Sequence, residues 1–140
     1  MTRRAKKRLT DLELEVMHAV WEAGEGPVTV RDVVERLEAR GRRLAYTSVQ
    51  TVMNILRRKG ALKSRPGPGR ALVYRAGISR QEATASMTED FVARLFGGHA
   101  EPLLAQLIEH ESIDRETLSE LKRAIEEQLG DERGQPGAGQ

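Results

Sequence analysis

The sequence of 140 residues contains no cysteine, which excludes disulfides, zinc sites with cysteine ligands and iron–sulfur clusters. It also lacks any apolar run that approaches the roughly 20 residues of a membrane-spanning helix. The basic N-terminus is not followed by the apolar segment that a signal peptide requires. These absences predict a soluble protein of the cytoplasm that does not insert into a membrane.

Residues suited to catalysis are also scarce. The histidines His18, His99 and His110 form no His-Glu-x-x-His zinc pattern, and no cysteine is present to act as a nucleophile. A serine triad assembled by the fold stays open, but no pattern indicates one. A weak metal or pH-sensitive site around the last two histidines is the alternative to simple solvation, because three glutamates lie close to them in sequence: Glu101, Glu109 and Glu111. We predict a protein that is not an enzyme and that holds no cofactor or metal.

The small net charge of +2 is the sum of two opposite halves. Residues 1–80 hold 18 Lys or Arg and 8 Asp or Glu, a charge of +10, whereas residues 81–140 hold 5 and 13, a charge of −8. A strongly basic half indicates a polyanionic partner. Charge pairing between the halves is the alternative, but the basic residues cluster around one helix and the segment that follows it.

That helix is predicted over Leu44–Gly60, and it contains no acidic residue. At about 100° per residue, one face is apolar, with Val49, Val52, Met53 and Leu56. The opposite face carries hydroxyl, amide and guanidinium groups, which bind base edges and phosphates. These groups belong to Thr47, Gln50, Thr51, Asn54, Arg57 and Arg58. An ordinary amphipathic core helix that happens to lack acids is the alternative.

Two shorter helices are predicted before this one. The capping box Thr10–Glu13 begins the first, which the glycine-rich stretch Gly24–Pro27 ends. Thr29 caps the second, and Gly41 ends it. Residues 28–30 have the composition to pair briefly as a strand before the second helix begins.

A basic hairpin is predicted after the third helix. Its strands cover residues 61–65 and 71–75, and the glycine- and proline-rich segment Pro66–Arg70 forms the turn between them. Three helices followed by such a hairpin predict a mainly α fold of the winged helix-turn-helix type. The third helix would then enter the major groove, and the wing would lie on the neighbouring backbone or minor groove.

The C-terminal half is predicted to be helical and to lack a core of its own. A second capping box, Ser79–Glu82, opens a helix that Gly97 and Gly98 end, and Asp114 opens the last helix. The apolar stripes of these helices are expected to meet those of a second copy of the chain. The residues expected at this contact are Met87, Phe91, Leu95, Leu103, Leu107, Leu118, Leu121 and Ile125. Packing onto the winged domain of the same chain is the alternative.

These elements define four regions. A basic arm covers residues 1–8, and the winged helix-turn-helix domain covers residues 9–78. A helical dimerisation region follows over residues 79–130, and a flexible tail covers residues 131–140.

Three stretches, Leu12–Glu22, Ala45–Val52 and Leu56–Leu62, resemble the penicillinase-repressor family of bacterial regulators, the BlaI/MecI/CopY group. The similarity runs from about Leu9 to Leu129, nearly the whole chain. The resemblance implies a homodimeric winged-helix repressor that binds a palindromic operator in double-stranded DNA. A winged domain that serves only protein–protein contact, without sequence-specific DNA binding, is the alternative.

The resemblance also implies where DNA is contacted. Family members touch bases with residues at the start of the third helix, and the polar face of that helix extends this set. The base contacts expected here are Tyr46, Thr47, Ser48, Gln50, Thr51 and Asn54. The wing arginine of the family corresponds to Arg70, and the expected phosphate contacts are Arg57, Arg58, Lys63, Arg65 and Arg70.

The family's modes of induction match this sequence less well. In the penicillinase and methicillin-resistance members, a membrane sensor triggers proteolysis after an Asn-Phe junction in the dimer region. The matching pair here is Gln106-Leu107, and this departure argues against cleavage at that point, while a membrane sensor protease stays open as a partner. Copper-responsive relatives carry C-terminal cysteines, so the absence of cysteine excludes their mode of sensing.

Overall fold

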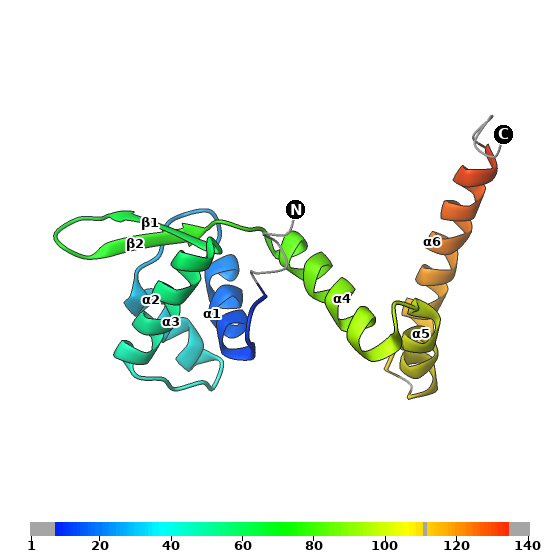
Figure 1. Cartoon of the computed structure of the whole chain (residues 1–140), viewed down its shortest axis with the longest axis horizontal. Helices are drawn as coiled ribbons and strands as arrows, with labels where there is room; N and C mark the ends of the chain where they lie inside the picture. Colours follow the sequence, from blue (N-terminus) through cyan, green and yellow to red (C-terminus); the bar gives the residue numbers. More distant parts are fainter. Residues whose placement is uncertain (1–7, 111, 135–140) are drawn as a thin grey trace. The chain divides into compact units, whose positions relative to one another are not determined.

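The computed structural model of the chain describes residues 8–110 and 112–134, and it confirms a mainly α fold with one hairpin (Figure 1). The elements in order are α1 (Asp11–Glu22), α2 (Val30–Ala39), α3 (Tyr46–Lys59), β1 (Leu62–Pro66), β2 (Leu72–Ala76), α4 (Arg80–Phe96), α5 (Ala100–Glu109) and α6 (Arg115–Gly134). The chain forms two compact units, Met1–Asp90 and Phe91–Gln140.

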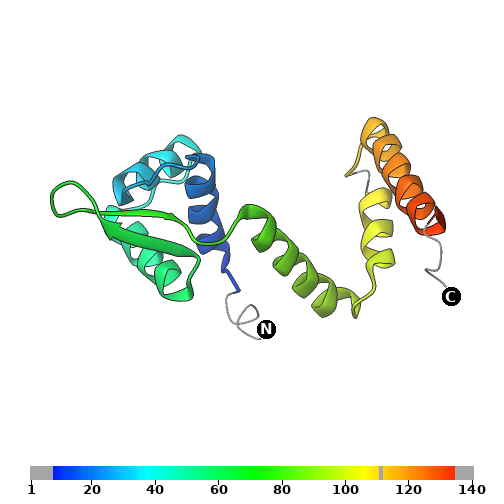
Figure 2. The same cartoon turned by 90° about the horizontal axis from the view of Figure 1, so that it is seen from above.

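The first unit has a core to which α1, α2, α3 and the hairpin all contribute (Figures 1 and 2). Its largest fully buried side chains are Val16 and Met17 of α1, Val33 and Leu37 of α2, Val49, Met53 and Leu56 of α3, and Leu62 of β1. The apolar face predicted for α3 is therefore the face that packs against the rest of the unit. This arrangement of three helices and a two-stranded wing is a winged helix.

The helix starts are formed by the local hydrogen bonds that the sequence predicted. The Thr10 hydroxyl accepts from the backbone N–H of Glu13 at 3.2 Å, and the Glu13 carboxylate accepts from the N–H of Thr10 at 3.0 Å. Thr29 and Asp32 make the same reciprocal pair, at 3.1 and 2.9 Å. Gly60 ends α3 in the left-handed conformation, with φ of 86°, which glycine adopts without steric cost.

Glu13 has a second role that the sequence did not indicate. Its side chain is buried and accepts a hydrogen bond from Lys59 Nζ at 2.6 Å. The same Nζ donates to the backbone carbonyl of Arg8 at 2.8 Å. A buried carboxylate requires such a partner, because an unpaired charge in the interior is strongly destabilising. The pair therefore joins the start of α1 to the end of α3.

The hairpin is antiparallel, with Lys63 opposite Arg75 and Ser64 opposite Tyr74. Val28 and Tyr74 exchange two backbone hydrogen bonds of 2.8 and 2.7 Å, so the predicted brief pairing before α2 is confirmed and occurs with β2.

The turn of the hairpin is shifted by one residue from the predicted segment Pro66–Arg70 to residues 67–71, because Pro66 already pairs with Leu72 at the end of β1. The N–H of Gly67 donates to the carbonyl of Ala71 at 2.9 Å. A Cβ on Gly67 would lie 2.6 Å from Val73 Cγ1, so any larger residue there requires Val73 to shift.

The start of α4 belongs to the first unit. Ser79 and Glu82 form the predicted capping box, at 2.9 and 3.0 Å. Ala83 is buried in the core of the first unit, and Met87 packs against that core. Met87 therefore contacts its own winged domain. The boundary between the units follows Asp90 inside α4, later than the predicted boundary at residue 78.

The second unit has no core of its own. Between Phe91 and Asp131, none of the described residues is buried. Its large exposed apolar side chains are Phe91, Leu95, Leu104, Ile108, Leu121, Ile125 and Leu129. None of the helices in the described residues is long and apolar enough to cross a membrane.

The two ends of the chain are only partly covered by the described residues. Residues 1–7 of the predicted arm and 135–140 of the predicted tail lie outside the described residues. Arg8, the last residue of the arm, forms an ion pair with Asp90 of α4 at 3.2 Å. Because α6 runs to Gly134, the first residues assigned to the tail are helical.

His18 lies where α1 meets the start of α4. Its ring contacts Trp21 edge-on at 5.5 Å, and its Nδ1 lies 3.2 Å from a guanidinium nitrogen of Arg80. Desolvation by burial lowers the pKa of His18 from 6.5, the positive charges of Arg80 and Arg40 lower it further, and Glu22 opposes them.

A first prediction concerns the buried face of α3. Met53→Ala removes a fully buried side chain, and we expect it to lower the free energy of unfolding by about 2–5 kcal/mol. Urea denaturation followed by the fluorescence of Trp21, the only tryptophan, measures this in the first unit. The exposed neighbour Gln50 is the control, since Gln50→Ala should change the value by less than about 0.5 kcal/mol. Equal effects of the two substitutions would contradict the packing described.

A second prediction concerns pH. Because the pKa of His18 is lower in the folded chain than its ordinary value of 6.5, the unfolded chain takes up the proton at higher pH. The free energy of unfolding should therefore fall as the pH is lowered from above 6.5 through the folded pKa. The same urea titration, repeated across this range, should show a smaller fall for His18→Gln. An unchanged pH dependence in that variant would show that His18 is not responsible.

Candidate nucleic-acid interface

The polar face of α3 is open to solvent, as the sequence predicted. Tyr46, Thr47, Ser48, Gln50 and Thr51 are exposed, and Tyr46 at the first helical position is 43% exposed. Asn54 is half-buried. The N-cap residue Ala45 makes no side-chain hydrogen bond to the helix start, and the first turn holds no acidic residue.

Two of the expected base contacts bond within the helix. The Thr51 hydroxyl donates to the carbonyl of Thr47 at 2.9 Å, and Asn54 Oδ1 accepts from Arg57 at 3.5 Å. This hydrogen bond uses the only proton of the Thr51 hydroxyl. The lone pairs of its oxygen and its methyl group stay available to a ligand. Thr51 is therefore suited to accept a hydrogen bond or to contact a thymine methyl group.

A contact between helices was missed by the sequence analysis. The guanidinium carbon of Arg31, in the first turn of α2, lies 5.8 Å from the centroid of the Tyr46 ring. This is within the range of a cation–π contact, which helps to hold Tyr46 at the start of α3. Nothing in the spacing of residues 31 and 46 indicates the pairing, because it depends on how α2 and α3 pack.

The region around α3 is free of negative charge. Residues 39–81 contain no Asp or Glu and 11 Lys or Arg. Four of these basic residues form ion pairs with acidic residues of α1 and α2. The pairs are Arg40–Glu22 (2.6 Å), Arg42–Glu15 (2.7 Å), Arg43–Glu38 (3.3 Å) and Lys59–Glu13 (2.6 Å). A fifth, Arg80, contacts His18 and the ring of Trp21.

The other six basic residues have no acidic partner in the described part of the chain. They lie at the end of α3 and on the hairpin, and all are exposed: Arg57, Arg58, Lys63, Arg65, Arg70 and Arg75. Five of them are the phosphate contacts expected from the sequence, and Arg75 is the addition. The structure therefore separates the basic residues that hold the fold together from those that face outward unpaired.

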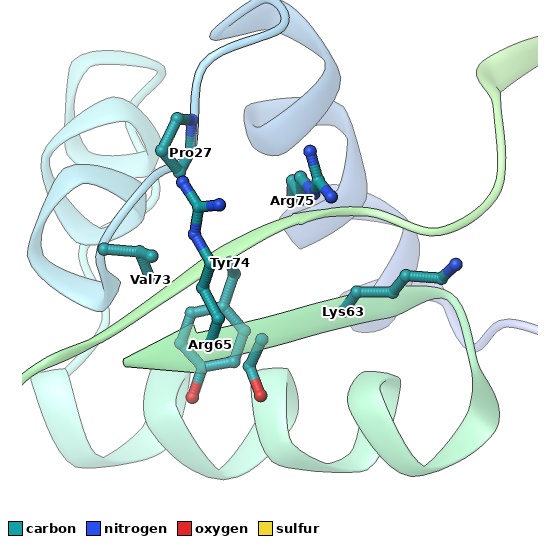
Figure 3. A pocket seen from close by; sticks show the side chains of 7 residues that line it. Pro27, Lys63, Arg65, Val73, Tyr74 and Arg75 are labelled. Atoms are coloured by element: carbon teal, nitrogen blue, oxygen red, sulfur yellow. The ribbon is translucent and has the colours of Figure 1, made fainter. Parts of the chain in front are cut away.

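A small pocket of about 180 Å³ lies on the hairpin, beside the loop before α2 (Figure 3). Its lining residues are Pro27, Lys63, Ser64, Arg65, Val73, Tyr74 and Arg75. Figure 3 shows Arg65 and Arg75 extending to the Pro27 side of the hairpin, whereas the ring of Tyr74 points away from Pro27. Three basic residues therefore line the pocket together with apolar and hydroxyl side chains.

Among the described residues, no group of three or more His, Asp or Glu side chains is placed to hold a metal ion. This includes the surroundings of His99 and His110, while Glu111 lies outside the described residues. The exposed surface of α3 and the hairpin is therefore polar and basic, and neither element contains an acidic residue.

The chain matches one protein family and several solved structures. The model of the penicillinase repressor family matches residues 9–127, which is most of the chain. The monomeric form of Bacillus licheniformis BlaI, solved in complex with the blaP half-operator, is 28% identical with a TM-score of 0.43, over 53% of this chain and 85% of that one. No curated protein sequence matches the chain.

Two ferric uptake regulators also match parts of the chain, at lower sequence identity. The Vibrio cholerae protein is 14% identical with a TM-score of 0.46, over 51% of this chain and 55% of that one. The match thus spans about half the length of the Vibrio protein. The Francisella tularensis protein is 15% identical with a TM-score of 0.45, over 65% of this chain and 81% of that one.

The third prediction separates base reading from phosphate binding. Thr51→Ala should weaken binding to a cognate site by about 1–3 kcal/mol and relax its specificity, whereas Arg70→Ala should weaken binding to cognate and random DNA alike. Titrations of both DNAs by fluorescence anisotropy measure the difference.

Two further variants identify which part of Thr51 is used. Thr51→Ser keeps the hydroxyl and removes the methyl group, and Thr51→Val does the reverse. If Thr51→Ala weakens both DNAs equally, Thr51 does not read bases.

Proposed function

Because the chain belongs to the penicillinase repressor family, we propose that it represses transcription as a homodimer on a palindromic operator in double-stranded DNA. In this proposal α3 lies in the major groove, and its exposed residues contact bases. Arg57 and Arg58 bind the phosphates beside that groove, and Lys63, Arg65 and Arg70 bind those beneath the wing.

The observation that carries the proposal is the set of six unpaired basic side chains next to a helix face without acids. Like charges that gather without counter-charges repel one another, so such a surface is stabilised by an anionic ligand. Binding to phosphates also releases counterions, which makes the affinity fall steeply with salt. Hydroxyl and amide groups on α3 add the means to distinguish bases.

The homodimer is supported by the second unit. Its exposed leucine, isoleucine and phenylalanine side chains have no core to enter within their own unit. A second copy supplies the same apolar faces, and a symmetric pair buries both sets together. The proposed contact comprises Phe91, Leu95, Leu103, Leu107, Leu118, Leu121 and Ile125. Two winged domains would then read half-sites about one DNA turn, roughly 34 Å, apart.

The proposed division of the chain follows from this. The winged domain begins at Leu9 and includes the start of α4, which packs on its core. The dimerisation region begins in the second half of α4 and continues through α5 and α6.

Proteolytic control through Gln106-Leu107 is not part of the proposal. This bond lies inside α5, with Gln106 exposed and Leu107 half-buried. A protease that binds its substrate extended would first have to unfold this helix.

The test is a footprint on the DNA upstream of the protein's own gene, at about 0.15 M salt, where nonspecific binding is weak. We expect a protected stretch with dyad symmetry. Salt-sensitive binding to any DNA without a discrete footprint would contradict sequence specificity. An absence of binding even at low salt would overturn the repressor and favour a module for protein–protein contact.

The fourth prediction addresses the dimer. Ile125 is 56% exposed, so Ile125→Glu should leave the single chain folded but place a charge in the proposed apolar contact. Sedimentation velocity should then show monomers, and binding to a full palindrome should fall to that of a half-site. Arg123→Glu, on the opposite face of α6, is the matched control and should remain dimeric. A dimer that survives Ile125→Glu would place the contact elsewhere.

A further inference from the structure

Arg31 lies in the first turn of α2, where a helix offers no favourable place for a cation. The positive end of the helix dipole lies at the N-terminus and stabilises acidic side chains there, such as Asp32 in this turn. Arg31 is exposed and does not belong to the core of the first unit. The stability of α2 therefore gives no reason for an arginine at this position.

An acidic residue at the right spacing along α2 is also left unused. Glu35 follows Arg31 by four residues, which is a spacing at which opposite charges on a helix form an ion pair. No ion pair of the described residues includes Arg31. Its guanidinium carbon instead lies 5.8 Å from the centroid of the Tyr46 ring. The arginine thus interacts with the next helix and not with its own.

Tyr46 is the first residue of α3, and little else holds its side chain. It is 43% exposed, and no hydrogen bond of the described residues uses its hydroxyl. The preceding residue, Ala45, adds no side-chain cap to the helix start. An exposed side chain loses conformational entropy when a ligand fixes it, and this loss weakens binding. The contact with Arg31 reduces the loss, because it restricts the ring before any ligand arrives.

The position of Tyr46 makes the orientation of its ring important for DNA recognition. In helix-turn-helix proteins the N-terminal residues of the recognition helix contact base edges. A tyrosine offers a hydroxyl that donates and accepts hydrogen bonds, and an apolar ring that can contact a thymine methyl group. These groups distinguish one base from another only if the side chain keeps one orientation.

We infer that Arg31 is a specificity-determining positioning residue, whose guanidinium holds the ring of Tyr46 so that Tyr46 reads a base in the major groove. The inference rests on the proposed function, since it takes α3 as the recognition helix. Arg31 acts through Tyr46 and does not itself bind a phosphate. This gives a residue of α2 a part in the choice of DNA sequence.

The loss of Arg31 should reduce specificity without reducing stability. Arg31→Ala should weaken binding to the footprinted operator about two- to fivefold, as expected for an exposed cation–π contact, and should leave binding to a random duplex unchanged. The slope of log affinity against log salt should stay the same, since no phosphate contact is lost. Thermal unfolding without DNA should be unchanged, because Arg31 is exposed. Arg31→Lys keeps the cation but loses the planar group, so it should restore part of the affinity.

A double-mutant cycle shows whether Arg31 acts through the ring. Tyr46→Leu removes the ring, so Arg31→Ala should cost no further affinity in that background. Tyr46→Phe keeps the ring, so the cost of Arg31→Ala should return. Arg36→Ala is the control for a lost charge on α2, because Arg36 is exposed and lies beside Asp32 and Glu35 at another pocket. It should leave the ratio of operator to random affinity unchanged.

NMR of the full-length protein without DNA gives an independent readout. The ring current of Tyr46 should shift the Nε–Hε signal of Arg31 in wild type and in Tyr46→Phe. In Tyr46→Leu the signal should return to the position of an ordinary exposed arginine. A signal at that ordinary position in wild type would overturn the inference, whatever DNA the protein binds.

The outcomes separate this inference from the proposed function. If wild type protects an operator but Arg31→Ala binds like Arg36→Ala, the inference is wrong and the repressor stands. The same holds if Arg31→Ala weakens operator and random DNA equally, makes the salt slope shallower and keeps its cost in the Tyr46→Leu background, since Arg31 then binds a phosphate directly. If wild type shows the shifted Arg31 signal but does not distinguish operator from random DNA, the specific repressor fails, and the role of Arg31 in specificity fails with it.

Discussion

The burial of one face of α3 is the constraint on which the rest of the first unit depends. Val49, Met53 and Leu56 are fully enclosed by α1, α2 and the hairpin. Because a helix turns by about 100° per residue, enclosing these residues fixes Thr47, Gln50 and Thr51 on the outside. The hydrophobic effect thus orients the helix so that its hydroxyl and amide groups point outward.

Ion pairs around this core divide the basic residues of the first unit into two groups. Acidic residues of α1 and α2 pair with four of the neighbouring basic side chains, and six others have no acidic partner in the described part of the chain. The end of α3 shows the division most clearly. Arg57 and Arg58 are exposed, whereas the adjacent Lys59 is held by the buried carboxylate of Glu13. Consecutive basic residues therefore differ in their surroundings: Lys59 is held within the fold, whereas Arg57 and Arg58 are open to solvent.

The two units differ in how much of their apolar surface they bury within the chain. The first encloses its apolar residues, including the start of α4, within one chain. The second leaves its leucines and isoleucines half-exposed on α5 and α6. A single copy of such short helices cannot remove that surface from water, and this is the physical basis for expecting a partner of the same kind.

The sequence by itself determined the features that depend on near neighbours. Capping boxes at Thr10, Thr29 and Ser79, the glycine at the end of α3 and the amphipathic period of each helix all act over three or four residues, so they can be read directly. Only the tertiary structure determined which residues that are far apart in the sequence come into contact. Glu13 and Lys59 are 46 residues apart. The contact of Arg31 with Tyr46 depends on how α2 and α3 pack. Side chains meet there because the folded core brings them together, and no local pattern encodes that distance.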